Sequence, residues 1–228
     1  MTAQAPSHIV IAIDGPSGVG KSTVAKRLAQ CLGYWYVDSG ALYRAVGWAV
    51  HACGVPFDDC GAIVELLERT SIKLRCQDGQ SEVWVGGKNI TFQLRGEEVG
   101  KAASAVATMP AVRRIITARL RQVCCQVDVV IEGRDIGTVV FPEATVKFFL
   151  DASLVVRGQR RFREMRQAGQ EMTLGQVVQA VTARDTQDRT RAAAPLRRAV
   201  EAHVIDTTDL TVDDVVRIML SEIHAKVQ

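Results

Sequence analysis

Residues 15–22 read GPSGVGKS, and this pattern, G-x-x-x-x-G-K-[ST], constrains the fold more than any other feature of the chain. An apolar, β-branched stretch at residues 8–13 precedes the pattern and favours a buried parallel strand. Residues 23–29 follow it with a sequence typical of the start of a helix. A strand, a glycine-rich loop and a helix in this order predict a phosphate-binding P-loop, because backbone N–H groups and the helix N-terminus together attract phosphate.

The P-loop also predicts the cofactors. Lys21 can reach the β- and γ-phosphates of a nucleoside triphosphate, and the Ser22 hydroxyl can ligand Mg²⁺. We therefore expect ATP and Mg²⁺ as cofactors, with Lys21 catalytic and Ser22 as the metal ligand. The expected nucleotide-binding residues are Gly15, Pro16, Ser17, Gly18, Val19, Gly20, Lys21, Ser22 and Thr23.

Composition limits the kind of partner. A net charge of +3 and an aromatic content of 5% argue against a nucleic-acid partner. No run of 18 apolar residues predicts a membrane span, and residues 1–7 lack the pattern of a signal peptide. The six cysteines form no C-x-x-C pair, which indicates reduced thiols. We therefore expect a cytoplasmic monomer with small-molecule substrates and no membrane or nucleic-acid partner.

Strand-like and helix-like segments alternate along most of the chain. This alternation predicts an α/β fold with a doubly wound parallel sheet, whose ligands bind at the carboxyl ends of the strands. The length of 228 residues fits one domain. The expected divisions are a single domain over 1–228, its core at 1–69 and 108–228, and a small insert at 70–107.

The insert has the pattern of a β-meander. Residues 72–76 and 81–85 alternate between apolar and polar side chains as half-buried antiparallel strands do, and Asp78-Gly79 predicts the turn between them. Gly86-Gly87 predicts a second turn, before a third strand within residues 89–94.

Polar side chains follow the predicted core strands at their carboxyl ends, where they should converge. Two arginines among several carboxylates suit a phosphate that is joined to a hydrogen-bonding head group. Glu132 can in addition hold Mg²⁺ through water. The converging residues are Asp14, Asp38, Ser39, Tyr43, Arg44, Glu132, Arg134 and Asp135.

Arginines crowd residues 157–166 and 184–198. Arg184, Asp188 and Arg191 share one face of a helix predicted at 174–191, because they are spaced i, i+4, i+7, whereas Asp185 lies elsewhere on it. Arginine clusters of this kind surround a polyphosphate or form solvated helix faces with ion-pair ladders. In a chain with a P-loop we favour phosphate for the clusters, and the helix face alone leaves both interpretations open.

Five strings occur in the order IAIDGPSGVGKST, DSGALYR, IEGRDIGTVVFP, RDTQDRTRAAAP and IDTTDLTVDDVV. Together they resemble the bacterial cytidylate kinases, a family of nucleoside monophosphate kinases, over nearly the whole chain. The resemblance implies transfer of the γ-phosphoryl group of ATP to CMP, and also to dCMP, in pyrimidine nucleotide metabolism. It further implies that the insert enlarges the monophosphate-binding region and that residues 153–170 form a helical lid.

The same resemblance assigns roles to residues on the acceptor side. Phosphate-gripping arginines correspond to Arg44, Arg134 and Arg191, and cytosine-reading residues to Ser104, Arg113 and Asp135. The ribose contacts correspond to Arg184 and Asp188, with Ser39 and Tyr43 lining the acceptor pocket. The lid arginines fall within 157–161. The expected catalytic set is Lys21, Arg134, Arg157 and Arg160.

Two other functions fit part of the sequence. A kinase of another small acceptor, such as a different monophosphate or a sugar acid, would share the P-loop, although the insert and the Gly133-Arg134-Asp135 string count against a sugar acid. A GTPase-type switch would carry a base-reading N-K-x-D motif, and the sequence contains none.

Overall fold

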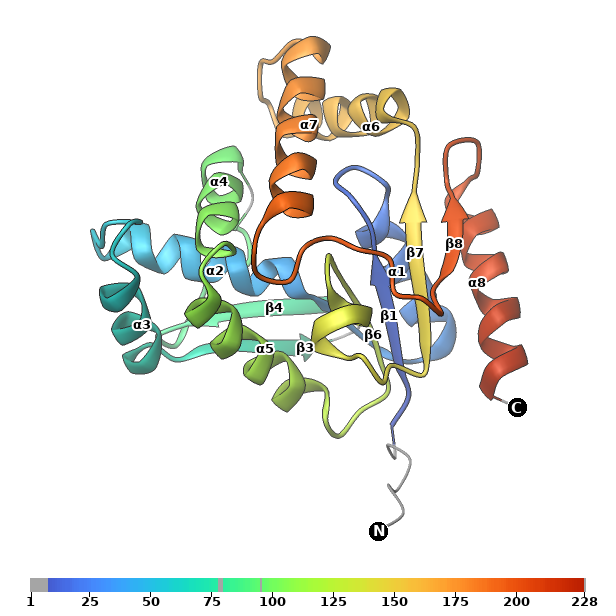
Figure 1. Ribbon diagram of the computed structural model, residues 1–228, viewed down its shortest axis with the longest axis horizontal. Coiled ribbons are helices and arrows are strands. Elements are labelled where there is room, and N and C mark those ends of the chain that lie inside the picture. Colours follow the sequence, from blue (N-terminus) through green and yellow to red (C-terminus); the bar gives the residue numbers. More distant parts are fainter. Residues whose placement is uncertain (1–7, 78–79, 95, 228) are drawn as a thin grey trace.

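A five-stranded parallel sheet forms the centre of the molecule, with the P-loop strand β1 as its middle strand. The computed structural model describes residues 8–77, 80–94 and 96–227 (Figure 1). The strand order is β2-β6-β1-β7-β8. The strands are β1 (Val10–Asp14), β2 (Trp35–Asp38), β6 (Val129–Gly133), β7 (Val146–Asp151) and β8 (His203–Asp206).

Helices cover both faces of this sheet (Figure 1). Successive residues of β1 enter different cores, because side chains of a strand alternate between its two faces. Ile11 and Ile13 pack in the core shared with α1 (Lys21–Leu32) and α8 (Val212–Val227). Val10 and Ala12 belong to the core on the opposite face, which α2 (Ser39–Ala52) and α5 (Pro110–Cys124) cover. The predicted doubly wound parallel sheet with a P-loop is confirmed.

The insert forms a separate antiparallel sheet of β3 (Ile72–Gln77), β4 (Gln80–Val85) and β5 (Lys88–Asn89). Its third strand is shorter than the predicted 89–94, because the Asn89 side chain accepts a hydrogen bond from the N–H of Thr91 at 3.0 Å and begins a turn. The turn predicted at residues 78–79 lies outside the described residues.

Helices α3 and α4 flank the small antiparallel sheet on the acceptor side. Helix α3 (Cys60–Arg69) leads into the insert, and α4 (Glu97–Val106) leaves it and packs along α2. Helices α2 and α4 approach closely at Gly47 of α2, where a Cβ would lie 2.8 Å from Ala102 Cβ of α4 and 2.9 Å from its carbonyl carbon. This contact places α4 beside the carboxyl ends of the strands.

A helical hairpin of α6 (Leu154–Gln167) and α7 (Leu174–Thr190) stands beyond the carboxyl ends of the strands (Figure 1). Met165, Val177 and Val181 give the hairpin a small core of its own. The region expected as a lid, 153–170, thus corresponds to α6 and is joined by α7. Within the described ranges, no helix has the length and apolar character needed to cross a membrane.

Candidate active site

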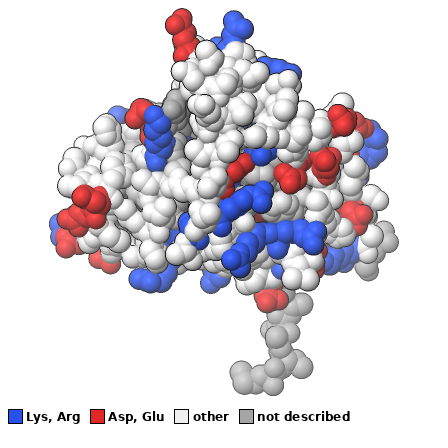
Figure 2. All heavy atoms as spheres, turned by 45° about the horizontal axis from the view of Figure 1, so that its top comes forward, with Lys and Arg blue, Asp and Glu red and all other residues white. Residues whose placement is uncertain are grey.

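A pocket of about 210 Å³ opens at the carboxyl ends of β1, β2 and β6, between the P-loop and the helices α4 and α7. On the face shown in Figure 2, acidic and basic side chains lie close together near the middle of the molecule. All residues predicted for the acceptor side line this pocket: Ser39, Tyr43, Arg44, Ser104, Arg113, Arg134, Asp135, Arg184, Asp188 and Arg191. The P-loop contributes Ser17, Gly18, Gly20, Lys21, Ser22 and Thr23, but not Gly15, Pro16 or Val19.

The P-loop surrounds the buried ammonium group of Lys21. At Gly15, where φ is +153°, a Cβ would lie 2.2 Å from Leu150 O of β7, so only glycine fits where the loop leaves β1. Lys21 Nζ donates to Gly15 O at 2.8 Å and to Pro16 O at 2.6 Å. Burial, followed by repulsion from Arg134, lowers the pKa of Lys21 to about 7. The loop therefore holds a cation that an anionic ligand would stabilise.

Glu132 is buried at the end of β6, beside Lys21 and the start of α1. Its Oε1 accepts a hydrogen bond from the Tyr36 hydroxyl at 2.6 Å. Burial, followed by repulsion from Asp38, raises the pKa of Glu132, and attraction to Lys21 and a hydrogen bond with Ser22 partly offset that rise. The Ser22 hydroxyl and a carboxylate thus stand together, and these are oxygen ligands that Mg²⁺ prefers.

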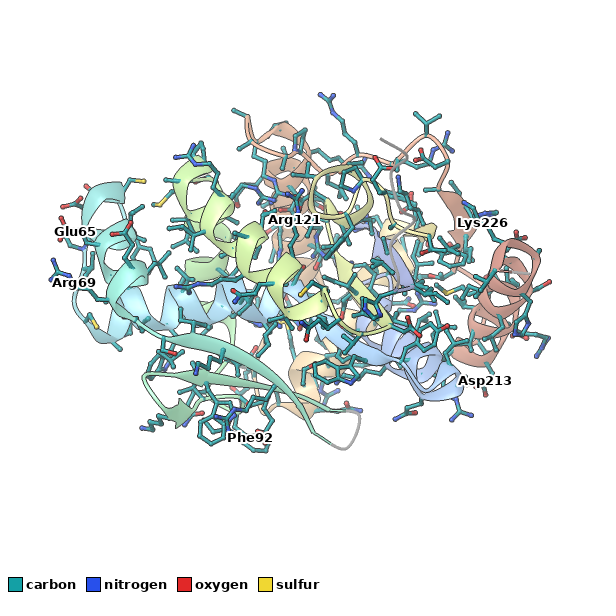
Figure 3. The ribbon with its side chains drawn as sticks, turned by 90° about the horizontal axis from the view of Figure 1, so that it is seen from below. Glu65, Arg69, Phe92, Arg121, Asp213 and Lys226 are labelled. Atoms are coloured by element: carbon teal, nitrogen blue, oxygen red, sulfur yellow. The ribbon has the colours of Figure 1, made fainter. Side chains whose placement is uncertain are left out.

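A π-helical turn, η1 (Ile136–Val140), fixes the direction of Arg134 and Asp135, which immediately precede it. The Asp14 carboxylate accepts hydrogen bonds from the first two N–H groups of the turn, each at 2.8 Å. Arg121 of α5 (Figure 3) donates to the carbonyls of its last two residues at 2.9 and 2.8 Å. Burial raises the pKa of Asp14 to about 6, although the hydrogen bonds from the N–H groups of Ile136 and Gly137 lower it. Sequence reasoning did not predict this turn.

Acidic and basic side chains form a continuous network along the acceptor side. Arg113 and Arg191 both pair with Asp135, and the Arg191 contact measures 3.3 Å. Arg191 also reaches Asp188 at 3.3 Å, and Asp188 accepts from Arg134 Nε at 2.9 Å. Burial alone would raise the pKa of Asp188, but Arg134 and the neighbouring arginines lower it overall. The ion-pair partners of Asp135 are therefore Arg113 and Arg191, and Arg134 pairs with Asp188.

Arg184 differs from the other arginines of the pocket. Arg44 forms an ion pair with Asp38, which raises its pKa against the opposing effect of burial. The Nε atom of Arg184 is buried, and no residue in the described part of the chain accepts a hydrogen bond from it. Burial, followed by repulsion from Arg134, lowers the pKa of Arg184 to about 10. This guanidinium is therefore the clearest sign that the pocket takes an anion or a hydrogen-bond acceptor.

The arginines of α6 lie in three different places. Arg157 is buried behind the P-loop, where it pairs with Asp185. Arg160 donates to Thr207 O at 2.6 Å and lines a second pocket of about 250 Å³ on the other side of the P-loop. Arg161 lines the main pocket. Neither Arg157 nor Arg160 lines the main pocket in this conformation, and the catalytic roles expected for them remain predictions.

Sequence reasoning missed two buried polar residues of the site. Thr207 follows the last strand, β8, and the rule that ligands bind at the carboxyl ends of strands could have indicated it. Helical spacing puts Asp185 away from the face that Asp188 shares with Arg184 and Arg191, yet Asp185 is buried against the P-loop while Asp188 lines the acceptor pocket. Helical spacing says which residues share a face, and it does not say what packs against each face.

A P-loop beside an arginine-lined pocket, at the carboxyl ends of a parallel sheet, defines a phosphotransferase of the P-loop class. The family model described as cytidylate kinase matches residues 11–225, and the chain belongs to this family. A cytidylate kinase of Syntrophotalea carbinolica is 43% identical, covering 97% of this chain and 94% of its own. One of Geobacillus kaustophilus is 44% identical, covering 96% and 98%. The crystal structure of an uncharacterized protein from Eubacterium ventriosum shares the fold at 14% identity, with a TM-score of 0.53 and coverage of 96% and 99%.

Proposed function

We propose that this protein transfers the γ-phosphoryl group of ATP to CMP, and also to dCMP, giving the diphosphate and ADP. The observation that carries the proposal is the buried Arg184, whose Nε has no acceptor among the described residues, in a pocket that faces the P-loop. Such a group fits a ligand with oxygen acceptors next to the phosphate donor site. Membership of the cytidylate kinase family supports CMP as that ligand.

On the donor side, the P-loop holds the ATP phosphates and Lys21 neutralises the charge that moves during transfer. When bound, Mg²⁺ would supply positive charge that stabilises the negative charge developing during phosphoryl transfer. Ser22 would ligand the ion directly and Glu132 through water, which fits the carboxylate beside that hydroxyl. The second pocket, which contains Arg160 and Thr207, lies beside the start of α1 and suits the nucleoside part of ATP.

On the acceptor side, we assign phosphate contacts to Arg44, Arg134 and Arg191. A guanidinium group can donate two parallel hydrogen bonds to two oxygens of one phosphate. Arg184 and Asp188 belong to α7 and line the same pocket, and we assign them to the ribose hydroxyls. No covalent intermediate is required, since positioning and charge neutralisation account for catalysis of this kind. Closure of the α6–α7 hairpin would exclude water from the reacting phosphate.

We assign recognition of the base to Asp135 and Arg113, with Ser104 beside them. Cytosine presents an amino donor at N4 and acceptors at N3 and O2, which a carboxylate and a guanidinium complement. Uracil presents a carbonyl at C4 and a donor at N3, so it would face both side chains with the wrong polarity. Buried polar groups that are left unpaired cost about 1–3 kcal/mol each, so we expect CMP to be preferred to UMP by roughly a hundredfold.

The decisive experiment measures ADP formation from ATP and Mg²⁺ with no acceptor and with CMP, dCMP, UMP, AMP or shikimate. The proposal expects turnover with CMP and dCMP, weak turnover with UMP, and a negligible rate without an acceptor. Equal rates with and without CMP would identify an ATPase instead. Faster turnover with another acceptor would identify a different small-molecule kinase.

A further inference from the structure

The buried ion pair between Arg157 and Asp185 joins the helical hairpin to the back of the P-loop. Arg157 lies in the first turn of α6 and Asp185 in α7, and both are more than nine-tenths buried. Arg157 Nε also donates to Ala152 O at 3.1 Å, which fixes its side chain at the end of β7. A buried pair of this kind is weak evidence of added stability, since removing two charges from water is costly.

The two side chains of the pair hydrogen-bond to the backbone N–H and C=O of one P-loop residue, Ser17. Asp185 Oδ1 accepts from the Ser17 N–H at 3.0 Å, and Arg157 Nη1 donates to the Ser17 carbonyl at 3.0 Å. In a trans peptide the C=O and N–H point in opposite directions. Holding Ser17 N–H at Asp185 therefore turns Pro16 O the other way, where it accepts from Lys21 Nζ at 2.6 Å.

The same reasoning applies to the next peptide. Because Arg157 holds the Ser17 carbonyl, the N–H of Gly18 points to the opposite side of the loop, and Gly18 lines the pocket. The loop has no room to move backwards at this point, since a Cβ on Gly18 would lie 2.8 Å from Arg157 O. Gly158 in turn lets α6 lie against α7, where a Cβ would meet Val178 Cγ2 at 2.5 Å.

We infer that Arg157 and Asp185 are positioning residues for the donor nucleotide: they set the peptide orientations on both sides of Ser17 and make the P-loop geometry depend on the α6–α7 hairpin. Neither side chain lines the main pocket, so neither is a catalytic residue. The inference rests on the proposed function only for the identity of the nucleotide that the P-loop binds.

The test measures dissociation constants for ADP with Mg²⁺ and, separately, for CMP by calorimetry. The variants are Arg157→Met, Arg157→Lys and Asp185→Asn, with Arg189→Ala, an exposed residue of α7, as the control. We expect Arg157→Met and Asp185→Asn to weaken ADP binding about tenfold or more while CMP binding changes less than about threefold. Arg157→Lys should recover part of the ADP affinity, because it keeps a donor at the end of a flexible chain.

A merely structural role would lower the thermal midpoint and leave both constants of the folded protein unchanged, or weaken both in the same proportion. Either result overturns the inference. If a single variant fails to fold because it leaves one buried charge, Arg157→Met/Asp185→Leu removes both charges and must show the same selective loss. Wild-type protein that binds ADP tightly but does not phosphorylate CMP would reject the proposed function, while the variant comparison would still decide the positioning role.

Discussion

Replacing Lys21 with Met should abolish turnover and at the same time stabilise the folded chain at neutral and acidic pH. Burial lowers the pKa of Lys21 from 10.5 to about 7, so the folded state binds this proton less readily than the unfolded state. Stability linked to such a group is present at high pH and is lost as the pH falls from 10.5 through 7. At about 1.4 kcal/mol per pKa unit, the full loss approaches about 5 kcal/mol below pH 6.

The magnitude at each pH follows from the same linkage. At pH 9 part of the loss has already occurred, about 2 kcal/mol, so the gain from Lys21→Met should grow by about 2.5 kcal/mol between pH 9 and pH 6. Methionine also removes the hydrogen bonds to Gly15 O and Pro16 O. The loss of each hydrogen bond costs about 1 kcal/mol at any pH. This cost therefore cancels when the stability change at pH 9 is subtracted from that at pH 6.

Urea unfolding of wild type, Lys21→Met and Lys26→Met at several pH values measures these differences. Lys26 is an exposed residue of the same helix and serves as the matched control, for which we expect little change with pH. A difference between Lys21→Met and wild type that stays constant from pH 9 to pH 6 would refute the assigned burial of the ammonium. Turnover of the variant above about a tenth of the wild-type kcat would refute its catalytic role.

Three further predictions follow from the geometry of the site. Asp135→Ala should lower the CMP-to-UMP ratio of kcat/KM by about tenfold or more, whereas equal losses for both bases would leave Asp135 with only a structural role. Glu132→Gln should raise the Mg²⁺ concentration needed for half-maximal rate, and an unchanged Mg²⁺ titration would remove Glu132 from the metal site. Gly47→Ala should destabilise the chain by about 1–3 kcal/mol in urea unfolding, because its Cβ would meet the backbone of Ala102 in α4; unchanged stability would show that α4 shifts freely.

The parts of the site that topology dictates could be predicted from sequence. Arg134 and Asp135 follow a buried strand, and the carboxyl ends of parallel strands converge whatever their side chains are. The P-loop was recognisable for a similar reason, since its glycines and its lysine are required by local backbone geometry. Both features depend on residues that are close in the sequence, which is where sequence patterns are informative.

The parts that were not predicted depend on distant partners. The turn η1 is held by Asp14, which lies more than a hundred residues earlier in the chain. The direction of Arg157 is set by Asp185 and by a backbone carbonyl of the P-loop. Long arginine side chains can point to either side of a helix, so an arginine-rich segment does not reveal which member reaches a phosphate. Among the described arginines of that segment, Arg161 lines the main pocket, whereas the predicted catalytic set contains Arg157 and Arg160.

The strand order has a consequence for folding during synthesis. Within the described ranges, β1 pairs only with β6 and β7, and β2 pairs only with β6. Neither early strand of the parallel sheet therefore has its partner until residues from 129 onward have left the ribosome. Among the described residues before that point, only the β3–β4–β5 meander pairs with its own sequence neighbours. The apolar strand β1 therefore remains without a strand partner during more than half of translation. Unpaired apolar strands of this kind tend to aggregate. Chaperone demand on the nascent chain should accordingly fall sharply once β6 and β7 have emerged.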